Sequence, residues 1–120
     1  MTRWLVDGMN LIGSRPDGWW RDRPRAMRAL VEELNALGEP VTVVFDGRPF
    51  ELEDTGSVEV LFASRRGRNA ADDDIAALVA RADAPEQWRV VTSDRELGQR
   101  VREHGAEVVG VGAFREQLEQ

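Results

Sequence analysis

The stretch VTVVFDG, residues 41–47, decides the fold that we expect for this chain. Its first five residues are β-branched or aromatic and do not alternate with polar positions, which is typical of a strand buried on both faces. An aspartate and a glycine end the run. A short apolar run closed by an aspartate recurs in WLVD at 4–7 and in RVVTSD at 89–94. Buried strands of this kind predict a parallel sheet with helices on both faces.

Helical and strand-like segments alternate along the rest of the chain. Residues 22–37 carry apolar side chains at the spacing of one helix face, with Pro24 in the first turn and Gly38 just past the end. We expect further helices at 70–83, 94–104 and 113–119, further strands at 58–62 and 107–111, and a loop at 47–57. This alternation predicts one three-layer α/β domain over residues 1–120, with a parallel sheet of about five strands.

The composition excludes several classes of chemistry. The 120 residues include no cysteine and one histidine, which excludes disulfides, zinc–thiolate sites and thiol nucleophiles. All 16 basic residues are arginine, which excludes sites that require a lysine, such as the Walker P-loop. The formal charge of −6, taken over the whole chain, argues against a nucleic-acid partner. No apolar run is long enough to span a membrane and no secretory leader precedes the first strand, so we expect a cytoplasmic protein.

Four aspartates are expected to meet at one edge of the sheet. Asp7, Asp46 and Asp94 follow three different strands, and the carboxyl ends of parallel strands share one edge, where ligands bind. Asp72 joins them from the helix that begins near residue 70, because it lies on the inward stripe of that helix. Asp74 is rotated from it by about 200° around the helix axis and is expected in solvent.

A divalent cation is the natural partner of such a set of carboxylates. Carboxylates that lie close together raise one another's pKa unless a cation neutralises them. Oxygen ligands and water suit Mg²⁺ or Mn²⁺, and the sequence does not distinguish the two. Because such a cation activates water and stabilises charge on a phosphoryl group, we expect phosphodiester cleavage. The residues predicted as catalytic metal ligands are Asp7, Asp46, Asp72 and Asp94, with Asp73 as an additional metal ligand.

Each acid also has a purely structural explanation. The Asp-Gly pairs at 7–8 and 46–47 are common at the start of turns. SDRE at 93–96 has the form of a capping box, and NAAD at 69–72 is similar to a helix cap. The arrival of four acids at the same edge of one sheet favours the catalytic explanation over four unrelated structural ones.

Arginines and tryptophans near this edge indicate how a substrate would be held. Arginine combined with aromatic rings holds single-stranded nucleic acid by phosphate contact and base stacking. The residues predicted to bind substrate are Asn10, Thr92, Ser93, Arg15, Trp19, Trp20, Arg21, Arg65, Arg66 and Arg68. The alternatives are capping by Asn10 and Ser93, packing of the tryptophans against the core, and a solvated loop at 65–68.

Four motifs together resemble the NYN domain, and within it the YacP-like branch of the PIN-like ribonucleases. They are VDGMNLI at 6–12, VFDG at 44–47, NAADD at 69–73 and VTSD at 91–94, and they span nearly the whole chain in this order. The resemblance implies a PIN-like fold with strand order 3-2-1-4-5 and a Mg²⁺- or Mn²⁺-dependent endoribonuclease. It places the family's site residues on Asp7, Asn10, Asp46, Asp72 and Asp94. A methionine at position 9 stands where family members usually have tyrosine.

Two other functions are considered beside RNA cleavage. One is an adaptor that binds RNA or the ribosome with the same fold and cleaves poorly, against which the intact acid set argues. The other is a phosphotransfer enzyme or receiver-type switch, which normally also uses a lysine that this chain lacks. The expected partner is RNA, either a messenger or a ribosome-associated RNA, and the sequence leaves open whether the chain is a monomer or a homodimer.

Overall fold

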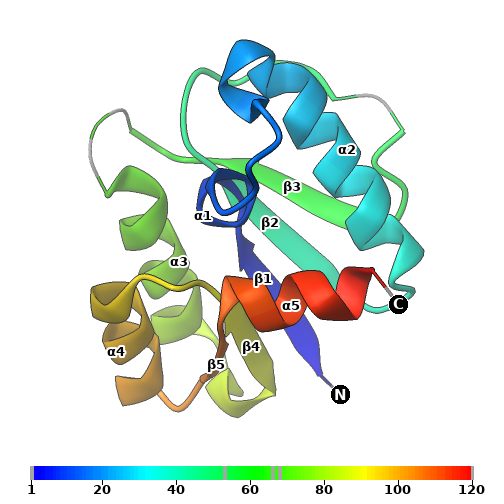
Figure 1. Cartoon of the computed structure of the whole chain (residues 1–120). Coiled ribbons are helices and arrows are strands. Elements are labelled where there is room, and N and C mark those ends of the chain that lie inside the picture. Colours follow the sequence, from blue (N-terminus) through cyan, green and yellow to red (C-terminus); the bar gives the residue numbers. More distant parts are fainter. Residues whose placement is uncertain (1, 53, 66, 68, 120) are drawn as a thin grey trace.

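A five-stranded parallel sheet forms the centre of the computed structural model, which describes residues 2–52, 54–65, 67 and 69–119. The strands are β1 (Arg3–Asp7), β2 (Val41–Phe45), β3 (Val58–Phe62), β4 (Trp88–Val91) and β5 (Glu107–Val109). Their spatial order is β3-β2-β1-β4-β5, with β1 in the middle (Figure 1). The expected α/β class and the strand order implied by the resemblance are therefore confirmed.

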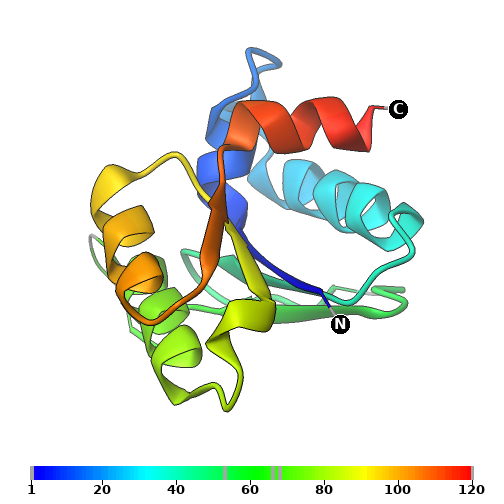
Figure 2. The same ribbon diagram turned by 90° about the horizontal axis from the view of Figure 1, so that it is seen from below.

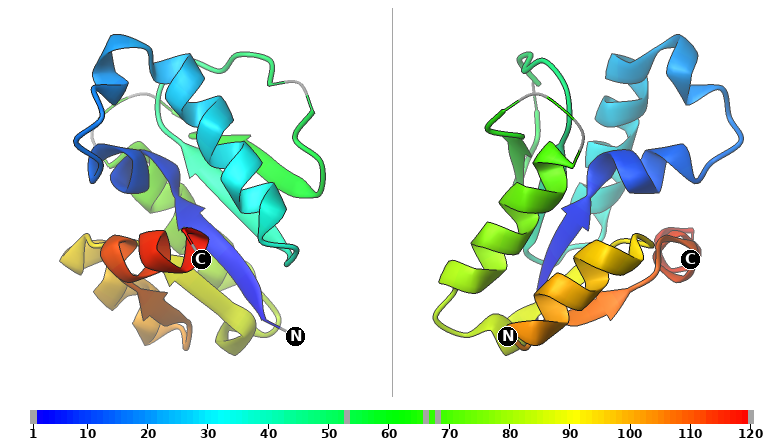
Figure 3. Two further views of the ribbon diagram at one scale, coloured as in Figure 1. Left: turned by 45° about the vertical axis from the view of Figure 1, so that its right-hand side comes forward. Right: turned by 90° about the vertical axis from the view of Figure 1, so that its left-hand side faces the viewer.

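Two layers of helices cover the sheet. Helices α1 (Gly8–Gly13), α2 (Arg23–Ala36) and α5 (Val111–Leu118) lie on one face, and α3 (Ala70–Arg81) and α4 (Arg95–Glu103) lie on the other (Figures 2 and 3). Alternate residues of β1 point to the two layers, so that Val6 packs with Leu11 and Leu30, while Leu5 packs with helices α3 and α4. The continuous apolar strands thus reflect burial on both faces, as the sequence indicated.

The register of the sheet brings the strand ends to a common level. Asp7 pairs with Val44 of β2, and Val6 pairs with Val91 of β4. Asp46 and Thr92 each follow directly on the last residue of their strand. The residues at the carboxyl ends of β1, β2 and β4 therefore lie at one edge of the sheet.

The structure differs from the sequence prediction mainly at helix α1. No helix was predicted for the residues that follow β1, yet Gly8–Gly13 form a helix. The segment has glycine at both ends and is too short to show a helical repeat, so its sequence alone favours no helix. Leu11 and Ile12 are buried in the core, and this tertiary packing stabilises the turn.

Smaller differences concern the ends of elements. Two short 3-10 helices, Trp19–Arg21 and Pro85–Gln87, were not predicted. Val111 was assigned to the last strand, but it is the first residue of α5, because β5 ends at Val109. The described residues include no helix with the length and apolar character needed to cross a membrane.

Gly8 is required by the close approach of α1 to β2. A β-carbon at this position would lie 2.5 Å from two ring atoms of Phe45 and 3.0 Å from Val43. Both neighbours are fully buried and have no room to move. We expect Gly8→Ala to lower the free energy of unfolding by about 2 kcal/mol, measured by urea denaturation.

Gly112→Ala is the matched control for this substitution. It also lies in a helix, but nothing is within 4 Å of its ideal β-carbon. Its free energy of unfolding should stay within about 1 kcal/mol of that of the unsubstituted chain. Equal losses from the two variants would contradict the packing explanation.

Candidate active site at the carboxyl edge of the sheet

Asp7 is the most buried acid of the candidate site. It ends β1, is 4% exposed, and accepts a hydrogen bond of 3.1 Å at Oδ2 from the hydroxyl of Thr92. The same hydroxyl accepts a bond of 3.1 Å from the backbone N–H of Asp94, so its single proton is directed to Asp7. Burial and, secondarily, repulsion from Asp72 raise the pKa of Asp7 to about 7.

Asp46, Asp72 and Asp94 come to the same edge of the sheet from three other elements. Asp46 follows β2, and its Oδ1 accepts a bond of 3.1 Å from the N–H of Ala71 in the first turn of α3. Asp72 is half-buried in the same turn. Its pKa is raised by burial first and then by the charges of Asp94 and Asp46. Asp72 therefore lies within electrostatic reach of all three other predicted catalytic acids.

Asp94 combines a structural role with a place at this edge. It precedes α4, and its Oδ1 accepts a bond of 2.9 Å from the N–H of Leu97, which is the bond of a helix N-cap. Its charge also raises the pKa of Asp72. The capping explanation and the site explanation thus apply to the same side chain.

The donor set suits a hard divalent cation by its chemistry. Carboxylate oxygens are preferred ligands of Mg²⁺ and Mn²⁺, and a cation would relieve the repulsion that raises the pKa values of Asp7 and Asp72. Within the described ranges, no three acidic or histidine side chains are grouped closely enough to hold a metal ion. Mg²⁺ usually takes only one or two carboxylates and keeps several waters, so a looser set of acids fits it.

Asp73 and Asp74 are hydrogen-bonded to basic and polar groups. Asp73, predicted as an additional metal ligand, accepts bonds from Arg65 and from Arg100, and its pKa is lowered by Arg100 and Arg65. Asp74, expected in solvent, accepts bonds of 2.6 and 2.8 Å from the backbone N–H and hydroxyl of Ser64. Asp74 therefore anchors the segment that follows β3.

Asn10 and Ser93 connect three elements beside the acids. The Asn10 side chain, on α1, accepts a bond of 2.9 Å at Oδ1 from the backbone N–H of Ser93. The hydroxyl of Ser93 accepts a bond of 3.1 Å from the N–H of Val111, the first residue of α5. These contacts fix the loop between β4 and α4, which carries Thr92 and Asp94, against α1 and α5.

The residues predicted to bind substrate fall into different surroundings. Trp20 is 59% exposed, whereas Trp19 packs against the core and meets Trp20 edge-on at 6.0 Å between ring centroids. Arg21 places its guanidinium 5.9 Å from the centroid of the Trp20 ring.

The other arginines predicted to bind substrate are paired or lie outside the described residues. Arg15 forms two bonds of 2.7 and 2.8 Å with Glu33 on α2. Arg66 and Arg68 lie outside the described residues, and Arg65 is bound to Asp73.

Arg100 was not among the residues singled out in the sequence. It donates a bond of 2.9 Å to Asp73, and its charge lowers the pKa of Asp72. The available signal was its position on α4, next to Val101 and three residues after Leu97, both of which are buried. Arg100 therefore flanks the stripe of α4 that faces α3.

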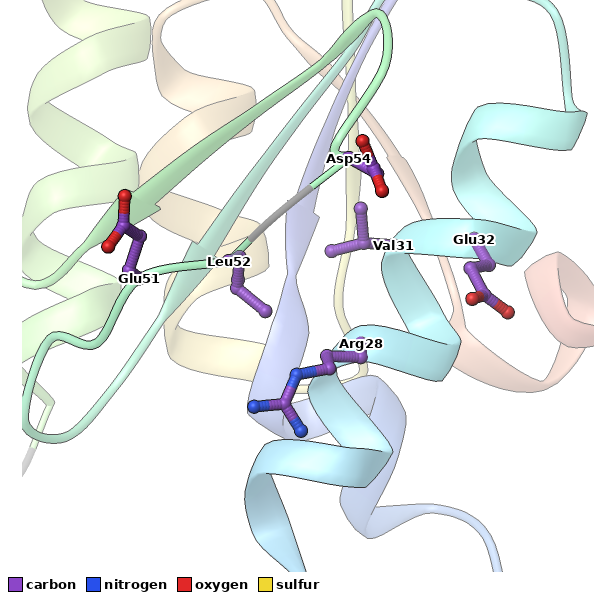
Figure 4. A pocket seen from close by; sticks show the side chains of 6 residues that line it. All are labelled: Arg28, Val31, Glu32, Glu51, Leu52 and Asp54. Carbon is purple, nitrogen blue, oxygen red and sulfur yellow. The ribbon is translucent and has the colours of Figure 1, made fainter.

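A pocket of about 480 Å³ lies away from the acids, between α2 and the loop after β2 (Figure 4). It is lined by Arg28, Val31, Glu32, Glu51, Leu52 and Asp54. Three of these six side chains are carboxylates, which repel phosphate. A hollow of about 130 Å³ adjoins Asp46 itself, and its lining includes Arg23 and Arg48. The smaller hollow is the one that extends the carboxyl edge.

Comparisons with known proteins agree with this architecture. Residues 4–120 match the family model of the YacP-like NYN domain. The crystal structure of Rae1 (YacP) from Bacillus subtilis superimposes with a TM-score of 0.79 and 27% sequence identity, over 99% of this chain and 74% of that one. A tryptophan-to-leucine variant of the same protein gives a TM-score of 0.80 and 26% identity, over 99% and 76%. A comparison with curated proteins gives no match. Because the family model covers nearly all of its length, the chain belongs to the YacP-like NYN domain family.

Proposed function

We propose that this chain is a metal-dependent endoribonuclease that cleaves RNA phosphodiester bonds at the carboxyl edge of its sheet. The observation that carries the proposal is the buried Asp7 carboxylate, whose pKa is raised by burial and by the charges of Asp72 and Asp46. Enzymes arrange such mutually repelling carboxylates where a cation or a proton is to be held. Membership in a family of PIN-like ribonucleases supports an RNA-related nuclease function.

Asp7, Asp46, Asp72 and Asp94 would hold Mg²⁺ or Mn²⁺. When bound, such a cation lowers the pKa of a water and stabilises charge on the phosphoryl group during in-line displacement. Thr92 directs its hydroxyl proton to Oδ2 of Asp7 and thereby fixes the orientation of that carboxylate. Asp46 and Asp94 are each held through Oδ1, by the backbone N–H groups of Ala71 and Leu97 respectively.

RNA would approach this edge over the exposed arginines and Trp20. The Trp20 ring offers a stacking surface for an unpaired base, and Arg21 beside it offers contact with a phosphate. We place the substrate class as single-stranded or locally unpaired RNA, messenger or ribosome-associated, met in the cytoplasm. Asn10 and Ser93 then act mainly by holding the loop that carries Thr92 and Asp94.

The substitution Asp94→Asn separates catalysis from helix capping. Asparagine caps helices about as well as aspartate, so the free energy of unfolding should change by less than about 0.5 kcal/mol. Cleavage of a labelled single-stranded RNA in Mn²⁺ should fall by at least about a hundredfold, because a ligand oxygen with negative charge is lost. Unchanged cleavage with an intact fold would remove Asp94 from the catalytic set, and absence of cleavage by the unsubstituted chain in both Mg²⁺ and Mn²⁺ would overturn the proposed function.

The RNA-binding adaptor is the second candidate. It is favoured by the spacing of the acids, since no three of them among the described residues are grouped closely enough to hold a cation. Calorimetric titration with Mn²⁺ distinguishes the two functions. Binding that is lost in Asp7→Asn supports the nuclease, and RNA binding without any Mn²⁺ binding supports the adaptor.

A further inference from the structure

Two arginines from different elements share one carboxylate beside the acids. Asp73, in the first turn of α3, accepts a bond of 2.9 Å at Oδ1 from Nη1 of Arg100 and a bond at Oδ2 from Nη2 of Arg65. Arg100 lies on α4, and Arg65 lies in the segment between β3 and α3. Two positive charges thus meet one negative charge, and the cluster of Asp73, Arg65 and Arg100 carries a net positive charge.

This cluster adjoins the candidate active site. Asp73 is the neighbour of Asp72 in the chain, and the charge of Arg100 is close enough to lower the pKa of the Asp72 carboxyl. The side chains of Arg65 and Arg100 are 54% and 39% exposed, so a ligand in solvent can reach both. The basic pair therefore lies at the rim of the acid edge, open to solvent.

The two guanidinium groups keep donors for a further anion. Each guanidinium has five N–H bonds in a fixed planar fork, and Asp73 engages one terminal nitrogen of each. Among the described residues, neither Arg65 nor Arg100 forms a hydrogen bond other than the one to Asp73. The remaining N–H groups match the spacing of phosphate oxygens, which arginine commonly binds in pairs.

We propose that Arg65 and Arg100 form a subsite for a backbone phosphate of RNA next to the scissile bond, and that Asp73 is the positioning residue that holds the two guanidiniums together. The proposal rests on the proposed function, because it takes the acid edge as the place of cleavage. It also gives Asp73 a role other than that of a metal ligand.

The test measures RNA binding without metal, so it does not depend on cleavage. A short single-stranded oligouridylate with a 5′ fluorescein label is titrated in EDTA at several salt concentrations, with fluorescence anisotropy as the readout. For single strands, each phosphate contact contributes about 0.7 to the slope of log K against log salt. Arg100→Gln and Arg65→Gln should each weaken binding and lower this slope by about 0.7.

Arg102→Gln is the matched control for Arg100→Gln. It removes the same charge from the same helix, but position 102 is rotated by about 200° from position 100 and lines a hollow on the outer side of α4. Its slope should equal that of the unsubstituted chain. Equal effects of Arg100→Gln and Arg102→Gln, or no measurable binding of the RNA by the unsubstituted chain, would overturn the phosphate subsite.

Asp73→Asn tests the positioning role. The substitution makes the chain less negative, so charge alone predicts tighter RNA binding. Loss of the Asp73 carboxylate that aligns the two guanidiniums predicts weaker binding. We expect weaker binding, with Mn²⁺ affinity unchanged in calorimetry. Tighter RNA binding or a loss of Mn²⁺ affinity would overturn this role of Asp73.

A separate cleavage assay in Mn²⁺ keeps the two proposals apart. If the chain cleaves RNA but Arg100→Gln lowers the salt slope of RNA binding no more than Arg102→Gln does, only the phosphate subsite is overturned. If Arg100→Gln lowers the salt slope more than Arg102→Gln does but the chain does not cleave RNA, only the proposed nuclease function is overturned.

Discussion

Asp7→Asn should abolish cleavage and stabilise the fold above neutral pH. We expect the rate of Mn²⁺-dependent RNA cleavage to fall by about a thousandfold or more, which corresponds to a loss of about 4 kcal/mol of transition-state stabilisation. At pH 8 the free energy of unfolding should rise, because the buried negative charge disappears while the amide oxygen can still accept the bond from Thr92. Single-turnover cleavage and urea denaturation measure the two effects.

Asp83→Asn is the control that removes one negative charge elsewhere. Asp83 is exposed and lies in the segment that leads into the amino end of β4, far from the acid edge in the sheet. Its cleavage rate and free energy of unfolding should match those of the unsubstituted chain. A comparable loss of cleavage in Asp83→Asn would show that the net charge matters and that Asp7 has no special role.

The contribution of Asp7 to the stability of the unsubstituted chain should fall as pH rises from about 4 to about 7. The pKa of Asp7 is about 7 in the folded chain and has its ordinary value of 3.8 when the residue is exposed. Between these values the folded chain retains a proton that the unfolded chain has released, so the free energy of unfolding decreases with pH. The difference amounts to about 4 kcal/mol for Asp7, of which none is lost below pH 4.

Urea denaturation at pH 5 and pH 8 measures this effect as the difference between the unsubstituted chain and Asp7→Asn. The two should be close in stability at low pH and diverge as pH rises, since titrating groups other than Asp7 and the neighbouring Asp72 and Asp46 contribute equally to both. Mn²⁺ at pH 8 should restore stability to the unsubstituted chain but not to the variant, because binding to the folded state alone is stabilising. A pH-independent difference between the two chains would contradict the burial of a titrating Asp7.

The sheet and three of its strand-end acids could be predicted because local sequence determines them. Strand β2 is a continuous run of β-branched and aromatic residues, and all five of its positions are buried. Asp7 ends β1, Asp46 follows the last residue of β2, and Asp94 lies three residues after the end of β4. Because the strands are parallel, their carboxyl ends share one edge, and this alone predicts that the acids lie close together.

Features that depend on tertiary partners were not accessible in the same way. Helix α1 forms because Leu11 and Ile12 are buried by distant elements, which outweighs the weak helical propensity of its six residues. Asp73 and Asp74 differ by one position, yet the first binds arginines and the second binds Ser64. Their partners come from the segment after β3 and from α4, whose placement no repeat in the sequence reveals.

The bond between Thr92 and Asp7 has a consequence for synthesis of the protein. It joins residues 85 positions apart, and Asp94 lies still further along the chain. Chains emerge from the ribosome with the N-terminus first, so β1 is made long before its neighbour β4. A nascent chain that ends before residue 92 lacks both the hydroxyl that orients Asp7 and the fourth acid, Asp94. The set of four acids is therefore complete only once residue 94 has been made, so shorter nascent chains do not carry the full set.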